Sequence, residues 1–167
     1  RDGIVTAGMR MRSYQATLFR DLDDVLIHAV SRSRDALDLA DGLDRVLDAA
    51  PISDDRKFLA AHAAHSYLAS TELLADEEGK PVFIVNEGEY QMMNTLDLTV
   101  DQAFYELDCT PWTVRSELDL FLRRYSYRDG VKGGIPGGAM SFTHDMGVAD
   151  QFTPIGRSSY ELERLHG

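Results

Sequence analysis

Apolar residues recur at helical spacing through the first third of the chain. They are Leu18, Leu22, Val25, Leu26, Ala29, Leu37, Ala40, Leu43 and Leu47. Steps of three and four residues place such side chains on one face of an α-helix. The pattern predicts a long amphipathic helix, or a broken pair of helices, over 18–49, and Pro51 ends it.

A second helix and a strand are predicted next. Ser53 is a suitable helix N-cap, and Asp54 and Asp55 suit the positive end of the helix dipole, so an Ala-rich helix is expected over 53–74. The short apolar run 82–85 follows Pro81 and is the one clear strand signal in the chain.

Two more helices are predicted before a long loop. Thr99 and Gln102 have capping-box spacing, which predicts a helix that begins there. Thr110 followed by Pro111 predicts the start of another, because proline is favoured at the first helical position. The Gly-rich stretch 127–156 is expected to be a functional loop. The fold class is therefore mainly α with one short strand, and helical periodicity leaves open an α/α toroid, a bundle or a helical repeat array.

The two ends of the chain predict a segment of a longer protein. Position 1 is Arg rather than Met. Ser158 and Glu161 form a capping box ahead of Leu162, which is how a helix begins. Because the chain stops where this helix opens, we expect that it has been cut from a longer polypeptide.

Composition excludes several classes of partner. The 28 acidic and 17 basic residues leave a net charge of -11, which repels nucleic acid and anionic membrane surfaces. Cys109 is the single cysteine, so an intrachain disulfide framework and a cysteine-based zinc site are excluded. His62 and His65 share a helix face without a third ligand at suitable spacing, so we expect no metal site and no cofactor.

Carboxylates cluster where the predicted strand ends. Glu87 and Glu89 follow the apolar run directly, and Asp97 lies a few residues later. Buried carboxylates are costly unless they are paired, hydrogen-bonded or face a wet cavity, so this cluster suggests a cleft. The alternative, which the residues by themselves favour, is that Glu87 and Glu89 are solvated loop residues and Asp97 caps a helix.

A His–Asp pair follows the Gly-rich loop. His144 and Asp145 carry groups that donate and accept hydrogen bonds, which suits binding of sugar hydroxyls. The alternative is that the two side chains only fix the loop.

Eight ordered motifs together resemble glycoside hydrolase family 52. They are HSY (65–67), VNEGEY (85–90), MMNT (92–95), DLTVDQ (97–102), PWTV (111–114), RYSY (124–127), HDMGVA (144–149) and SSYEL (158–162). They cover nearly the whole chain. The related family 116, of glucosylceramidases and β-glucosidases, has a similar arrangement of Glu-Gly, Tyr, Asn-Thr and Asp, and a similar His-Asp loop.

The resemblance implies a retaining β-xylosidase that releases xylose from the non-reducing ends of xylo-oligosaccharides. It implies an N-terminal β-sandwich followed by an (α/α)6 catalytic barrel, of which residues 1–167 would be the N-terminal portion. By the Glu-Gly context it assigns the nucleophile to Glu87. Glu89 is the alternative, because this chain has one residue fewer than family 116 before Tyr90. If the strand continued, both glutamates would point to the same side.

The same resemblance implies roles for three further residues and for a missing one. Asp97, His144 and Asp145 resemble positions that hold sugar hydroxyls, and the acid/base would be an aspartate beyond Gly167. The isolated chain is therefore expected to be inactive and, with unpartnered apolar helix faces, to self-associate.

Two other functions stay open: a β-glucosidase of the same clan, and a non-catalytic helical interaction module. We expect a xylo-oligosaccharide or aryl β-xyloside as partner, no nucleic acid and no membrane. The resemblance suggests a cytoplasmic enzyme. The sequence leaves open whether the longer protein is a monomer or a homodimer.

Overall fold

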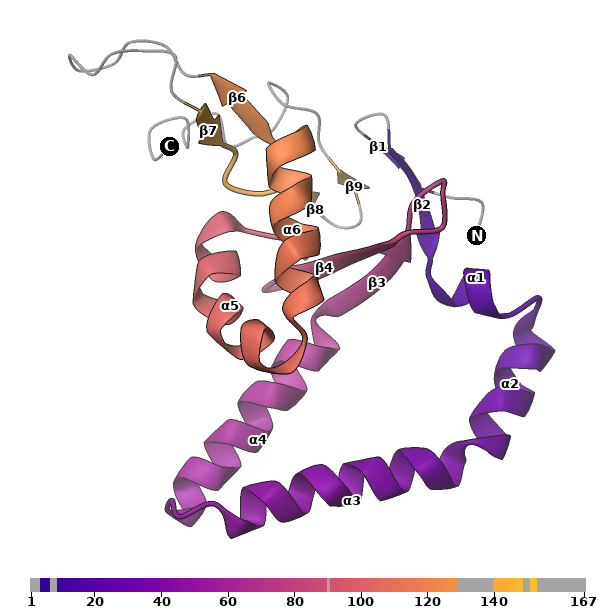
Figure 1. The fold of residues 1–167 in the computed structure, drawn as a ribbon, viewed down its shortest axis with the longest axis vertical. Helices are drawn as coiled ribbons and strands as arrows, with labels where there is room; N and C mark the ends of the chain where they lie inside the picture. Colours follow the sequence, from indigo (N-terminus) through magenta and orange to yellow (C-terminus); the bar gives the residue numbers. More distant parts are fainter. Residues whose placement is uncertain (1–3, 7–8, 90, 129–139, 149–150, 153–167) are drawn as a thin grey trace. The chain divides into compact units, whose positions relative to one another are not determined.

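A computed structural model describes residues 4–6, 9–89, 91–128, 140–148 and 151–152. The chain separates into two compact units. One unit contains residues 1–14 and 70–167, and the other contains residues 15–69. The first unit holds a sheet with a helical hairpin, and the second is made of helices (Figure 1).

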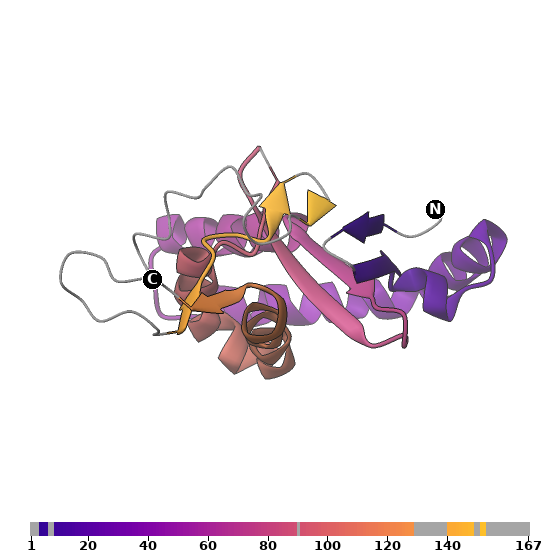
Figure 2. The ribbon, with the colours of Figure 1, turned by 90° about the horizontal axis from the view of Figure 1, so that it is seen from above.

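The first unit is built on a seven-stranded antiparallel sheet. Its strands lie in the order β1 (Ile4–Thr6), β2 (Met9–Ser13), β3 (Thr71–Ala75), β4 (Pro81–Glu87), β5 (Met92–Met93), β8 (Gly147–Val148) and β9 (Gln151–Phe152). The sheet curls until the outer strands β1 and β9 contact each other, as Figure 2 shows from above. A separate ribbon pairs β6 (Ser126–Arg128) with β7 (Met140–Phe142).

The prediction of a single strand was wrong. The predicted segment 82–85 is confirmed within β4, but eight more strands occur among the described residues. β3 occupies the end of the helix predicted over 53–74, because that helix stops at Ala69 and Thr71–Ala75 pairs with β4. The other missed strands have two to five residues, too short for an alternating pattern to stand out.

A helical hairpin packs beside the sheet. α5 (Leu96–Cys109) contacts α6 (Pro111–Arg124), and α6 contacts β4. The predicted start at Thr110–Pro111 is confirmed, with Pro111 in the first turn. The predicted start at Thr99 was wrong: α5 begins at Leu96 with Thr95 as N-cap, and Thr99 is buried inside the helix.

The core of this unit joins the sheet to α6 and to the segment before β8. Its buried members are Met11, Leu74, Val82, Ile84, Met93, Phe121, Tyr125 and Met146. Phe121 packs edge-on against Phe142, with ring centroids 6.2 Å apart. Burial of side chains this large supplies about 1.5–3 kcal/mol each, so the packing holds β4, β5 and the 143–146 segment as one body.

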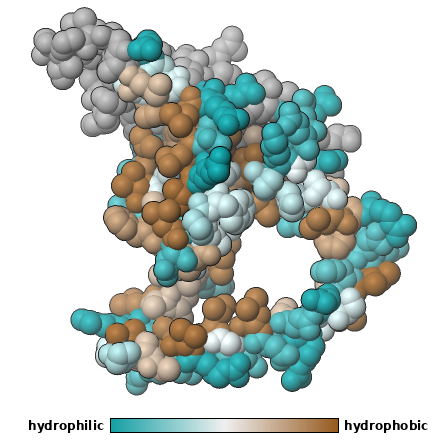
Figure 3. Space-filling view, in the orientation of Figure 1, coloured by the Kyte–Doolittle hydropathy of each residue, from teal (hydrophilic) through white to brown (hydrophobic). Residues whose placement is uncertain are grey.

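The second unit consists of α1 (Gln15–Leu18), α2 (Leu22–Ser31), α3 (Ser33–Ala49) and α4 (Asp54–Ala69). The expected broken pair over 18–49 is confirmed, and the break lies at Arg32 while Gly42 is inside α3. Ser53 caps α4 by accepting a hydrogen bond from the Arg56 N–H. None of these helices has a buried residue, and apolar side chains such as Leu26 and Val46 are exposed. Figure 3 shows hydrophobic atoms, in brown, on the surface of the molecule.

The mainly helical class is thus confirmed, with a curled sheet added to it. The six helices of the described residues form one hairpin beside the sheet and a separate helical unit, so no barrel closes within them. The (α/α)6 barrel remains a prediction about the longer protein.

A pair of buried carboxyl groups connects α5 to α6. Glu106 and Glu117 are both fully buried. The Thr113 hydroxyl donates to Glu106 Oε2 at 2.7 Å, and the Gln102 amide donates to Glu117 Oε2 at 3.2 Å. Burial and the nearby Glu106 carboxylate raise the pKa of Glu117 to about 8. Two like charges in one apolar site are mutually unfavourable, so Glu117 is the member that keeps a proton.

This pair predicts a pH-dependent stability. The ordinary pKa of Glu117 is 4.5 and the folded pKa is higher, so folding takes up a proton between these values. The stabilisation is complete below about pH 4.5 and is lost as pH rises towards 8. Glu117→Gln is expected to remove a slope of about 1.4 kcal/mol per pH unit from the free energy of unfolding across this window.

Urea denaturation of the chain at several pH values measures that slope. Glu77→Gln is the matched control, because Glu77 is exposed and its substitution should leave the slope unchanged. Parallel pH curves for wild type and Glu117→Gln would contradict a raised pKa of Glu117 in the folded protein.

Candidate functional site

The end of β4 places Glu87 at the edge of the apolar sheet. Glu87 is the last residue of β4, is half-buried, and pairs with Met92 across the β4–β5 ladder. Directly after it, Gly88 adopts a φ of 59°, a conformation that glycine enters without steric cost. The Gln91 N–H then donates to the Gly88 carbonyl and closes the reversal into β5.

Glu89 lies within this reversal and is exposed. The expectation that Glu87 and Glu89 point to the same side applied only to a strand that continues to Glu89, and β4 stops at Glu87. The two glutamates therefore have different surroundings: Glu87 is held by the β4–β5 ladder, whereas Glu89 is on a turn.

The structure brings the other three predicted residues together. His144 Nε2 lies 3.7 Å from Asp97 Oδ1, and His144 Nδ1 lies 3.3 Å from Asp145 Oδ2. The Asp97 side chain is 70% exposed, the His144 side chain 24% and the Asp145 side chain 2%. The cluster is thus anchored at its buried end by Asp145 and presents Asp97 to solvent.

Asp145 is held by more than its histidine neighbour. Its Oδ1 accepts a hydrogen bond from the Gly147 N–H at 2.8 Å. The pKa of Tyr125 is raised above its ordinary value, mainly because the Tyr125 side chain is buried and secondly because the Asp145 carboxylate lies nearby. The Tyr125 hydroxyl donates to the Met146 carbonyl at 3.1 Å. Asp145 therefore fixes both the loop and the orientation of the His144 ring.

Main-chain hydrogen bonds connect this cluster to the sheet. The Leu96 N–H donates to the His144 carbonyl at 2.6 Å, and the Met146 N–H donates to the Met93 carbonyl at 2.9 Å. Met92 pairs with Val148 in β8 as well as with Glu87 in β4. Glu87, Asp97 and the His144–Asp145 pair are therefore attached to the same three neighbouring strands.

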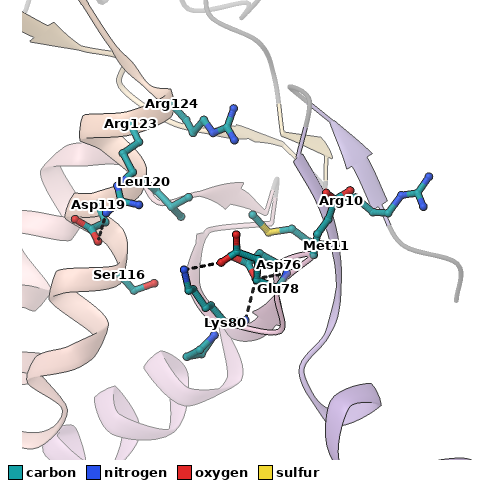
Figure 4. Close-up of a pocket in the computed structure, with 12 residues that line it drawn as sticks. Arg10, Met11, Asp76, Glu78, Lys80, Ser116, Asp119, Leu120, Arg123 and Arg124 are labelled. Carbon is teal, nitrogen blue, oxygen red and sulfur yellow. Dashed lines mark hydrogen bonds and ion pairs between the residues drawn. The ribbon is translucent and has the colours of Figure 1, made fainter.

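A pocket of about 320 Å³ lies elsewhere in this unit (Figure 4). Its charged lining residues are Arg10, Asp76, Glu77, Glu78, Lys80, Asp119, Arg123 and Arg124. None of the five predicted site residues lines it. Four of these residues are acidic and four are basic, and Lys80 forms an ion pair with Glu78 at 2.6 Å.

Two residues that support the site were not singled out from the sequence. Asn94 is buried between β4 and the start of α5, and Tyr125 is buried beneath the His144–Asp145 loop. Asn94 occurs in the motif MMNT and Tyr125 in the motif RYSY, but the composition of these motifs does not reveal which polar groups become buried. An Asn directly after an apolar pair and before a helix cap is the one local signal.

Comparison with known proteins decides the family. The model of glycosyl hydrolase family 52 matches residues 1–167. The chain belongs to glycosyl hydrolase family 52. Two similar proteins, both named beta-xylosidase and both from Geobacillus stearothermophilus, are 49% identical over 162 residues and 44% identical over 173 residues. These alignments cover 93% and 100% of this chain.

The family 52 chain spans about a quarter of the length of these relatives, 26% and 24% of each. Within the residues that the structure describes, no group of three or more His, Cys, Asp or Glu side chains is arranged to hold a metal ion. No helix in the described part of the chain has the length and apolar character needed to cross a membrane.

The buried end of the His144 cluster predicts a difference between its two aspartates. Asp145→Ala should lower the free energy of unfolding by about 1.5–3 kcal/mol, because it removes the buried carboxylate that accepts the hydrogen bond of the Gly147 N–H. Asp97→Ala is the matched control and should change it by less than about 0.5 kcal/mol, since Asp97 is exposed.

Urea unfolding of the two variants and wild type, followed by circular dichroism, tests the difference. Equal losses of stability in both variants would show that burial of Asp145 does not stabilise the loop.

Proposed function

We propose that this family 52 chain is the part of a retaining β-xylosidase that carries the nucleophile and part of the sugar-binding site. The observation that carries the proposal is the attachment of Glu87, Asp97 and His144 to one set of paired strands. The printed names of both relatives, beta-xylosidase, support the substrate class. The longer protein would complete an (α/α)6 barrel around these strands.

Glu87 is the proposed nucleophile. A nucleophile must be held at a fixed distance from the anomeric carbon, and a residue in a strand ladder is held more firmly than one on a turn. Glu87 has this support from its pairing with Met92, whereas Glu89 is exposed on the turn. Glu87 is also only half-buried, so part of this residue is accessible from solvent.

The chemistry would proceed in two displacements. A Glu87 oxygen attacks the anomeric carbon of the terminal xylose, the glycosidic C–O bond breaks, and an acid protonates the leaving oxygen. Water then attacks the same carbon, its proton passes to the conjugate base of that acid, and Glu87 is released as a carboxylate. We propose that the acid/base is an aspartate outside this chain, at roughly 5–5.5 Å from Glu87 in the complete site.

Asp97 and His144 are proposed to bind the hydroxyls of the cleaved xylose. Asp97 is exposed and accepts hydrogen bonds, and His144 faces it through Nε2. Asp145 would act in the same subsite with His144, whose ring it orients. This assignment requires no metal or cofactor. The setting that the family implies is a cytoplasmic enzyme acting on imported xylo-oligosaccharides.

Substrate preference tests the proposed activity in the full-length protein. It is expected to hydrolyse an aryl β-xyloside with a higher kcat/KM than the matching aryl β-glucoside, because the glucoside adds a hydroxymethyl group that a xylose pocket need not accommodate. Initial rates with the two nitrophenyl glycosides give the ratio. Preference for the glucoside would favour a β-glucosidase instead, and no turnover of either would favour a non-catalytic helical module.

Covalent labelling identifies the nucleophile. Incubation of the full-length protein with a 2-fluoro-xylosyl fluoride should trap the glycosyl-enzyme on Glu87. The fluorine at C2 slows hydrolysis of this intermediate, and the fluoride leaving group keeps its formation faster than its hydrolysis, so the intermediate accumulates. Peptide mass spectrometry locates the label. Glu87→Gln should abolish labelling, and Glu89→Gln, the same change on the neighbouring turn, should retain it. A label on Glu89 would reverse the assignment.

A further inference from the structure

The side chain of Asn94 takes the place of a missing piece of β-strand. Asn94 is 1% exposed and follows β5, which is only two residues long. Its Oδ1 accepts a hydrogen bond from the Val85 N–H at 2.6 Å, and its Nδ2 donates to the Phe83 carbonyl at 3.3 Å. A side-chain amide has the donor and acceptor of a peptide group, so it continues the ladder along β4.

The backbone of Asn94 adds a third bond to the same strand. Its N–H donates to the Val85 carbonyl at 2.8 Å. Its φ is 44°, in the left-handed region that asparagine tolerates better than most residues. The left-handed turn redirects the chain from β5 into α5, which begins two residues later at Leu96. Asn94 is therefore the residue at which β4 and the start of α5 are joined.

The strand that Asn94 binds is the one that ends at Glu87. Val85 lies two residues before Glu87. The three hydrogen bonds from Asn94 to Val85 and Phe83 therefore hold the backbone of β4 in place just before the proposed nucleophile. On its other side Asn94 lies three residues before Asp97. The His144 loop is held by two main-chain bonds that the Asn94 side chain does not make, from the Leu96 N–H to the His144 carbonyl and from the Met146 N–H to the Met93 carbonyl. The Asn94 carboxamide adds one long contact to this loop, from Nδ2 to Met146 Sδ at 3.6 Å.

We propose that Asn94 is a positioning residue for the reaction: its carboxamide holds β4 so that Glu87 is fixed relative to Asp97 and His144. This inference rests on the function proposed above. A catalytic group displaced by about 1 Å can cost roughly 10²-fold in rate. Loss of the carboxamide therefore lowers kcat, while KM changes less because the bonds that hold His144 remain.

Asn94→Gly in the full-length protein removes the carboxamide but keeps a residue that adopts a positive φ without strain. Gln91→Gly is the matched control, because Gln91 also has a positive φ, 50°, and is exposed on the preceding turn. On an aryl β-xyloside, Asn94→Gly is expected to lower kcat by about 10- to 100-fold, and labelling by the 2-fluoro-xylosyl fluoride should slow in parallel. Gln91→Gly should retain the wild-type kcat.

Asn94→Asp separates positioning from a general loss of structure. When the introduced carboxyl is protonated it can accept from the Val85 N–H and donate to the Phe83 carbonyl, as the amide does. When it is ionised, the second bond becomes a repulsion between two oxygens. The ratio of the variant kcat to the wild-type kcat should therefore rise as pH is lowered. A thermal melting curve of the variant at each pH checks that it is folded at the assay temperature.

The outcomes separate the two proposals. An active wild type with equal kcat for Asn94→Gly and Gln91→Gly overturns the role of Asn94 and leaves the proposed function standing. A pH-independent loss of kcat in Asn94→Asp as large as that in Asn94→Gly, or a loss confined to KM, also overturns it. A wild type that cleaves no glycoside and takes no label overturns the proposed function, and the positioning role with it.

Discussion

The pairing of β4 with the short strand β5 is the constraint on which the rest of the candidate site depends. Only two register pairs join these strands, and the second of them includes Glu87. The ladder then passes from β5 to β8, so the end of β4 and the start of β8 are held at a fixed spacing. Asn94 lengthens this ladder with side-chain atoms, because the chain must leave the sheet to begin α5.

Several buried polar groups of this region are satisfied by hydrogen bonds. Asp145 accepts the Gly147 N–H, and Tyr125 donates to the Met146 carbonyl. A buried polar group without a partner would cost about 1–3 kcal/mol, so these bonds exclude alternative loop conformations. The buried Glu106–Glu117 pair is stabilised by a proton on Glu117, because this proton removes the repulsion between the two carboxylates.

Local sequence signals predicted the helices better than the sheet. Ser53 and Pro111 mark helix starts through properties of single residues, and both were confirmed. Thr99 has the spacing of a capping box, but α5 begins one turn earlier because Leu96 packs against the core and its N–H binds the His144 carbonyl. The helix predicted over 53–74 included most of β3, and only pairing with β4 decides that residues 71–75 are strand.

By itself, the sequence determined the mainly helical class, the strand before Glu87 and the set of polar residues from which the site is proposed, since spacing and residue type carry these directly. Tertiary structure alone decided that the strand stops at Glu87, that Glu89 is exposed on the turn and that Asp97, His144 and Asp145 meet. The physical reason is that a hydrogen-bond partner far along the chain leaves no local pattern. His144 meets Asp97 because the ladder from β5 to β8 brings their segments together.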